Sequence, residues 1–132
     1  EEKGKFYLFV KSSPNPDNLL LLVSDHVNGK FERVEGFDDS MGAQTKGMYE
    51  APTAVKLADG RWCLFADFYG AGCAGQGYVP FVSDDLTKGV FTRADASFHF
   101  PYGFKHGTIL PITEEEYERM LARDWTDVPD LR

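Results

Sequence analysis

Two parts of this chain repeat each other. Residues 4–11, Gly-Lys-Phe-Tyr-Leu-Phe-Val-Lys, align without a gap with residues 60–67, Gly-Arg-Trp-Cys-Leu-Phe-Ala-Asp. A second pair of similar segments follows in the same order, at 23–33 and 82–93. Two ordered matches at nearly one spacing indicate two copies of a supersecondary unit of about 57 residues. This length exceeds most solenoid repeats and lies near the upper range of β-propeller blades.

Each copy of the repeat is predicted to consist of β-strands separated by turns. Asp-Gly at 59–60 is a tight-turn signal. A further strand is expected at 50–57, and because Pro52 lacks an amide donor, this strand should lie at a sheet edge. The other strands are expected at 5–11, 19–24 and 31–34 in the first copy and at 61–68, 78–83 and 91–93 in the second.

The strands at 5–11 and 61–68 are apolar at successive positions, not only at alternate ones. Such strands are expected to be buried on both faces of their sheet. Sheets stacked face to face around an axis meet this requirement, whereas an exposed meander would alternate apolar with polar residues. The sequence therefore predicts an all-β fold built from propeller-like blades.

The end of the chain carries a helix signal. Thr113 can act as the N-cap, and Glu116, three residues on, completes a capping box. With 132 residues the chain is expected to form one domain. The expected division is blade A at about 3–36, blade B at about 48–95, the apolar inner strand of a third unit at about 103–112, and the helix at about 114–122.

Charge and hydropathy argue against two classes of partner. The formal net charge is −7, and binding to a phosphate backbone requires concentrated positive charge. No apolar run approaches the roughly 20 residues of a membrane helix. The chain also begins without Met or a signal-peptide pattern, so we expect it to be an excised piece of a longer protein. We expect neither a nucleic acid nor a membrane partner.

Glu50 and His106 are candidates for a site in a central channel. The innermost strand of a propeller blade is an edge strand that lines this channel. Glu50 opens the 50–57 strand, where a carboxylate could act as a general acid and apolar neighbours should raise its pKa. His106 opens the apolar run of the third unit and is expected to face the same channel. The alternatives are a solvated glutamate at a strand end and a structural histidine.

Four more residues are candidates for contacts with a sugar. Tyr69 directly precedes the Gly-rich segment 70–77 and Gln76 lies near its end; an aromatic ring can stack on a sugar and an amide can bind its hydroxyls. Phe104 and Lys105 directly precede His106. We assign substrate binding to these four residues. The alternatives are a Gly-rich hairpin without function and, for Lys105, an ordinary surface charge.

Four blocks in this order resemble a known enzyme family. They are Gly-Lys-Phe-Tyr-Leu-Phe at 4–9, Tyr-Glu-Ala-Pro-Thr-Ala-Val-Lys at 49–56, Gly-Arg-Trp-Cys-Leu-Phe at 60–65 and Phe-Lys-His-Gly-Thr at 104–108. The sequence resembles the C-terminal part of the five-bladed β-propeller glycosidases of glycoside hydrolase family 43, in particular its arabinosidase-like and xylosidase-like members. The similarity spans about residues 3–117, less than half of a family member. It implies a partial five-bladed β-propeller of about two and a half four-stranded antiparallel blades with a short C-terminal helix.

The resemblance also implies roles for individual residues. Family members invert the anomeric centre with a base, an acid and a third acidic residue that tunes the acid, and Glu50 matches the acid. His106 matches a histidine that commonly holds a metal ion, often calcium, largely through water. Ala51 stands where the family often has glycine. The base and the third acidic residue lie in blades that precede this segment in the family, and we find no matching aspartate here.

The sequence therefore predicts a segment of a glycoside hydrolase that cleaves arabinose- or xylose-containing saccharides by inversion. It would carry the general acid but lack the base, so the segment alone should be inactive. No organic cofactor is expected. The alternative is a non-catalytic carbohydrate-binding or self-assembling half-propeller. Because isolated blades would expose apolar sheet faces, we expect a homo-oligomer or contact with the remainder of the propeller.

Overall fold

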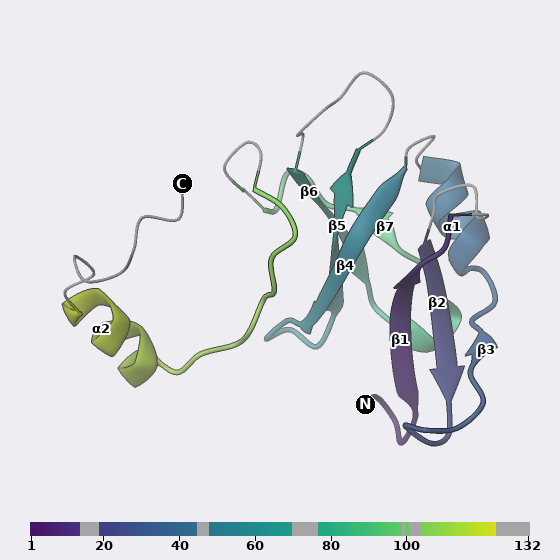
Figure 1. Cartoon of the computed structure of the whole chain (residues 1–132), viewed down its shortest axis with the longest axis horizontal. Helices are drawn as coiled ribbons and strands as arrows, with labels where there is room; N and C mark the ends of the chain where they lie inside the picture. Colours follow the sequence, from purple (N-terminus) through teal and green to yellow (C-terminus); the bar gives the residue numbers. More distant parts are fainter. Residues whose placement is uncertain (14–18, 45–47, 70–76, 99, 101–103, 124–132) are drawn as a thin grey trace.

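The computed structural model describes residues 1–13, 19–44, 48–69, 77–98, 100 and 104–123. Two antiparallel sheets lie next to each other, with one helix beside the first sheet and a second helix extending away from the sheets (Figure 1). The first sheet has the order β1 (Phe6–Lys11), β2 (Leu19–Ser24) and β3 (Glu32–Arg33). The second has the order β4 (Tyr49–Lys56), β5 (Trp62–Phe68), β6 (Gly77–Ser83) and β7 (Thr92–Arg93). The described chain is therefore mostly β, consistent with a partial propeller.

The strand register repeats between the two sheets. Phe6 lies opposite Ser24 in the first sheet, and Trp62 lies opposite Ser83 at the equivalent place in the second. Strands β1, β2 and β3 thus correspond to β5, β6 and β7. The internal repeat predicted from the sequence is a structural repeat, and β4 is the strand of the second sheet that has no counterpart among the described residues of the first.

The main hydrophobic core lies between the two sheets. Phe9, Phe37 and Phe91 meet edge to face with ring centroids 5.5–5.9 Å apart, an arrangement that aromatic rings favour. Phe9 comes from β1, Phe37 begins α1 (Phe37–Gln44), and Phe91 precedes β7. Further buried members come from both sheets, among them Leu19, Leu21, Tyr49, Leu64, Val79 and Phe81.

Burial on both faces holds for the second sheet only. Five consecutive residues of β5 are buried, and a second cluster around Cys63, Phe65 and Tyr78 covers its other face. Strand β1 is only partly buried, and Leu8 is 45% exposed. Within the described chain the outer face of β1 is therefore not covered, which agrees with the apolar sheet faces that isolated blades are expected to expose.

The two helices and the segment between β7 and α2 test the sequence predictions further. Helix α2 (Glu114–Ala122) begins with the predicted capping box of Thr113 and Glu116. Helix α1 was not predicted. The inner strand expected at about 103–112 does not form among the described residues 104–112, which are irregular, with His106 in the left-handed region. No helix in the part of the chain that the structure describes is long and apolar enough to cross a membrane.

Strand β4 is an edge strand, as Pro52 predicted, and it carries an irregularity near its start. Its register with β5 shifts between Glu50 and Thr53, and Ala51 has a φ of 46°. A residue with a Cβ is strained in this left-handed region, whereas glycine is not. This strain gives a reason for the glycine that is common at this position in the family resembled.

We expect Ala51→Gly to stabilise the chain by about 0.5–1 kcal/mol. The substitution releases roughly 1–2 kcal/mol of backbone strain but adds about 0.5–1 kcal/mol of unfolded-state entropy. Thermal and urea unfolding measure the difference. Ala54→Gly, further along β4 and not in the positive-φ region, is the matched control and should lower stability. A loss of stability in both variants would contradict the assigned strain.

Candidate functional site

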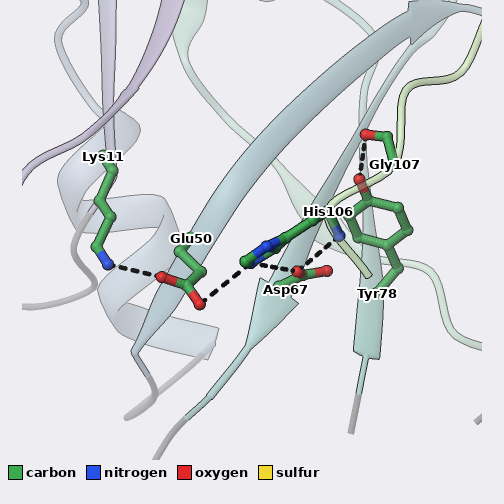
Figure 2. A network of polar contacts seen from close by, with 6 residues as sticks. All are labelled: Lys11, Glu50, Asp67, Tyr78, His106 and Gly107. Atoms are coloured by element: carbon green, nitrogen blue, oxygen red, sulfur yellow. Dashed lines mark hydrogen bonds and ion pairs between the residues drawn. The ribbon is translucent and has the colours of Figure 1, made fainter. Parts of the chain in front are cut away.

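Polar side chains from both sheets meet at one edge of the molecule. The site lies where β1 ends, β4 begins and β5 ends, and the irregular segment at 104–107 closes it (Figure 2). Lys11, Glu50, Asp67 and His106 form a connected network there. Residues far apart in the sequence are therefore brought together by the pairing of the two blades.

Glu50 lies at the centre of this network. Its Oε2 accepts a hydrogen bond from Lys11 Nζ at 2.7 Å, and its Oε1 lies 3.3 Å from His106 Nε2. The hydrogen bond from Lys11 lowers the pKa of Glu50 below its usual value, against a smaller opposing effect of burial. Our expectation of a raised pKa is therefore wrong in this arrangement. Apolar neighbours on its own strand do not outweigh an ammonium group from the other sheet.

Asp67 lies directly opposite Glu50 on β5 and is fully buried. Its Oδ2 accepts a hydrogen bond from the backbone N–H of His106 at 2.9 Å and lies 3.1 Å from His106 Nε2. Its Oδ1 has no hydrogen-bond partner among the described residues. Burial raises the pKa of Asp67, and the His106 N–H opposes this only in part.

Lys11 and Asp67 were not among the predicted site residues. They occupy equivalent positions of the internal repeat, at the ends of β1 and β5. One signal in the sequence could have pointed to Asp67: it is the one charged residue of the otherwise apolar strand β5. Lys11 and Asp67 lie on either side of Glu50 only because the two blades pack together, and the local sequence pattern does not predict this packing.

His106 belongs to this site although it is not on a strand. Its φ is 55°, and its ring turns back toward Glu50 and Asp67 (Figure 2). Glu50 is ionised at neutral pH and only accepts hydrogen bonds, so the Nε2 that faces it has to carry a proton in order to bond. His106 and Glu50 do lie next to each other, as predicted, whereas the inner strand that was expected to bring them together does not form among the described residues 104–112.

The metal role of His106 stays a prediction. Among the described residues, no group of three or more His, Cys, Asp or Glu side chains is arranged to hold a metal ion. A protonated Nε2 turned toward two carboxylates is unsuited to direct coordination. The described residues thus do not by themselves form a calcium site.

The predicted substrate contacts surround the network to different extents. The ring of Tyr69 lies 4.8 Å from Lys11 Nζ, a cation–π contact beside Glu50. Phe104 is 48% exposed and stacks on Phe100. Lys105 is exposed, and its charge contributes to lowering the pKa of Glu50. Gln76 lies outside the described residues.

The segment that carries His106 is fastened to the second sheet. The hydroxyl of Tyr78 donates to the carbonyl of Gly107 (Figure 2), and the backbone N–H of Tyr78 donates to the carbonyl of Phe104 at 3.0 Å. Tyr78 itself is buried among aromatic rings. Both ends of the 104–107 segment are thus held by one residue of β6.

Comparison with known proteins places this chain in a family. No curated protein and no solved structure matches the chain. The family model described as "Probable glycosyl hydrolase domain", of the glycosyl hydrolase 43-related type, matches residues 1–118. The match includes Lys11, Glu50, Asp67 and His106 and covers most of the chain. The chain therefore belongs to the glycosyl hydrolase 43-related family.

Proposed function

We propose that this chain supplies the acid side of an inverting glycoside hydrolase that acts on arabinose- or xylose-containing oligosaccharides and polysaccharides. The observation that carries the proposal is the Glu50 carboxylate, partly exposed at the start of an edge strand and held between Lys11 and His106. The membership of the chain in a glycosyl hydrolase family supports it. The resemblance of residues 49–56 to the family's acid segment supports Glu50 as the acid.

In this mechanism the carboxylic acid of Glu50 gives its proton to the glycosidic oxygen as the bond to the anomeric carbon breaks. A water molecule attacks that carbon from the opposite face and loses a proton to a base. The resemblance assigns the base to another part of the propeller. Lys11 favours the ionised form of Glu50. For Glu50 to act as a general acid, its pKa must therefore be raised, either by a neighbouring negative charge or by displacement of Lys11. The third acidic residue of the family would supply such a charge.

The surroundings of Glu50 suit a sugar. Tyr69 and Phe104 offer aromatic faces on which a sugar ring can stack, and Lys105 offers a donor for hydroxyls. Gln76 completes the proposed set of substrate contacts. A calcium ion near His106, bound through water, belongs to the same proposal and would add positive charge at the channel centre.

A second candidate function is carbohydrate binding without catalysis. The observation that favours it is the ion pair between Lys11 and Glu50, because an ionised Glu50 accepts hydrogen bonds from sugar hydroxyls but has no proton to give. Aromatic rings and paired charges are sufficient for binding. In this case the chain would retain the blades of a hydrolase for recognition only.

Hydrolysis and binding assays separate these two functions. The chain, alone and joined to the remaining blades, would be incubated with arabinan, xylan and aryl arabinosides and xylosides. We expect release of sugar with the inverted anomeric configuration, followed by proton NMR, only when the base is present. Saturable binding without hydrolysis in the joined protein would favour the binding module. Retention of configuration would contradict the inverting mechanism.

We also propose that the remaining blades, or a second copy of the chain, cover the exposed apolar residues. Leu8 on the outer face of β1 is 45% exposed, and Leu110 in the segment before α2 is 73% exposed. Covering such residues removes apolar area from water, which favours association. The homo-oligomer and the completed propeller are the two forms of this proposal.

The Lys11 contact gives a prediction about pH. Lys11→Met should raise the pKa of Glu50, seen as an upward shift of its side-chain carboxyl carbon titration by NMR. Because the folded pKa of Glu50 is depressed, the stability due to this pair is present above the unfolded value of 4.5 and is lost as pH falls through the folded pKa. Both side chains are partly exposed, so the loss should not exceed about 1 kcal/mol.

The control for this prediction is Lys5→Met, which removes the lysine of the Lys5–Asp25 pair in the same sheet. It should leave the titration of Glu50 unchanged. An unshifted Glu50 midpoint in Lys11→Met would mean that the ion pair does not form in solution.

A further inference from the structure

Asp67 is a carboxylate in a place where its strand otherwise supplies apolar residues. It is fully buried, and its side chain lies within hydrogen-bonding distance of His106. Burying a carboxylate is unfavourable unless hydrogen bonds and opposite charge compensate for the lost water. Among the described residues, the side-chain oxygens of Asp67 make their close contacts with one residue of the 104–107 segment, His106.

A single oxygen of Asp67 holds His106 at two points. Oδ2 accepts a hydrogen bond from the backbone N–H at 2.9 Å and lies 3.1 Å from Nε2 of the ring. Figure 2 shows the ring folded back over this carboxylate, toward Glu50. The backbone contact fixes where the segment lies, and the ring contact fixes where the imidazole points.

The backbone of His106 requires such a partner. Its φ of 55° is uncommon for a residue other than glycine and persists only where the surroundings impose it. The hydrogen bonds of Tyr78 fasten the residues on either side, Phe104 and Gly107, but none of them reaches His106 itself. Asp67 is the described residue that bonds the N–H of the strained position.

We propose that Asp67 is a positioning residue, which holds the backbone and imidazole of His106 so that Nε2 is presented to Glu50. Its role in catalysis rests on the proposed function of Glu50, whereas its role in placing His106 does not. An apolar residue at this place would pack in β5 equally well but would leave the His106 N–H without its acceptor.

Amide hydrogen exchange, measured by NMR on the whole chain, tests the placement directly. Asp67→Ala should speed exchange of the His106 N–H about tenfold or more, because the bond to a charged acceptor is lost. Asp67→Asn keeps an oxygen acceptor in the same place and should restore most of the protection. Ser83→Ala changes another buried polar residue at the opposite end of the same strand pair and is the matched control. Unchanged His106 exchange in Asp67→Ala would overturn the proposal.

Kinetics of the active protein provide the second measurement. Asp67→Ala should lower kcat about tenfold or more with KM changed less than about threefold, because misplacement of a catalytic group acts on the chemical step. Asp67→Asn should recover part of kcat. A rise in KM with unchanged kcat would contradict the positioning of His106 for the chemical step. If Glu50→Gln keeps full hydrolysis, the proposed function fails, yet the exchange rates still decide the role of Asp67.

Discussion

Replacing Glu50 by glutamine should lower the hydrolysis of unactivated arabinosides or xylosides by roughly 10²- to 10⁴-fold, the usual contribution of a general acid. The substitution keeps the size of the side chain and its ability to accept a hydrogen bond from Lys11 at 2.7 Å. It removes the proton that the leaving oxygen needs. Aryl glycosides whose leaving group departs without protonation should lose much less activity. The ratio of the two losses is therefore the measurement that identifies an acid.

The matched control for this variant is Glu2→Gln. Glu2 is also paired with a lysine, Lys56, at 2.6 Å, and its pKa is also lowered by that contact. The Glu2→Gln substitution makes the same change of charge as Glu50→Gln, but away from the network of Glu50, Asp67 and His106. Full activity is expected in Glu2→Gln. Equal and small losses on activated and unactivated substrates in Glu50→Gln would remove the acid assignment and favour the binding module.

The strands were predictable because the repeat and the local patterns agree. Pro52 placed β4 at an edge, and Thr113 with Glu116 placed the start of α2, since each effect acts within a few residues. Helix α1 has no comparable signal. It follows from packing: Phe37 inserts into the core, and the Ser40 hydroxyl bonds the backbone of Phe91.

The site was predictable only in part. Glu50 and His106 were found from a motif, and they do lie together. The direction of the Glu50 pKa was missed because Lys11 arrives from the other blade, 39 residues away in sequence. Asp67 was missed because a single carboxylate in an apolar strand does not indicate which residue it contacts. Tertiary contacts decide both, and local sequence does not encode them.

Phe91 joins the second sheet to the first sheet and to helix α1. It is fully buried, lies edge to face with Phe9 of β1 and Phe37 of α1, and has its backbone clamped by the Ser40 hydroxyl at 2.8 and 2.9 Å. Strand β1 and helix α1 thus both contact this one ring. Removing that ring leaves a cavity that rigid strands on both sides cannot readily fill.

We therefore expect Phe91→Ala to lower the free energy of unfolding by about 3–5 kcal/mol, a large part of the stability of a small domain. Urea unfolding followed by tryptophan fluorescence measures this loss. Phe31→Ala is the matched control, because Phe31 holds the equivalent position of the first repeat but is only partly buried and lies outside the main core. Its loss should be clearly smaller. Equal losses of stability in the two variants would mean that the sheets do not pack through Phe91. In that case the aromatic contacts of Phe91 with Phe9 and Phe37 would add nothing to the cost of deleting a phenylalanine ring.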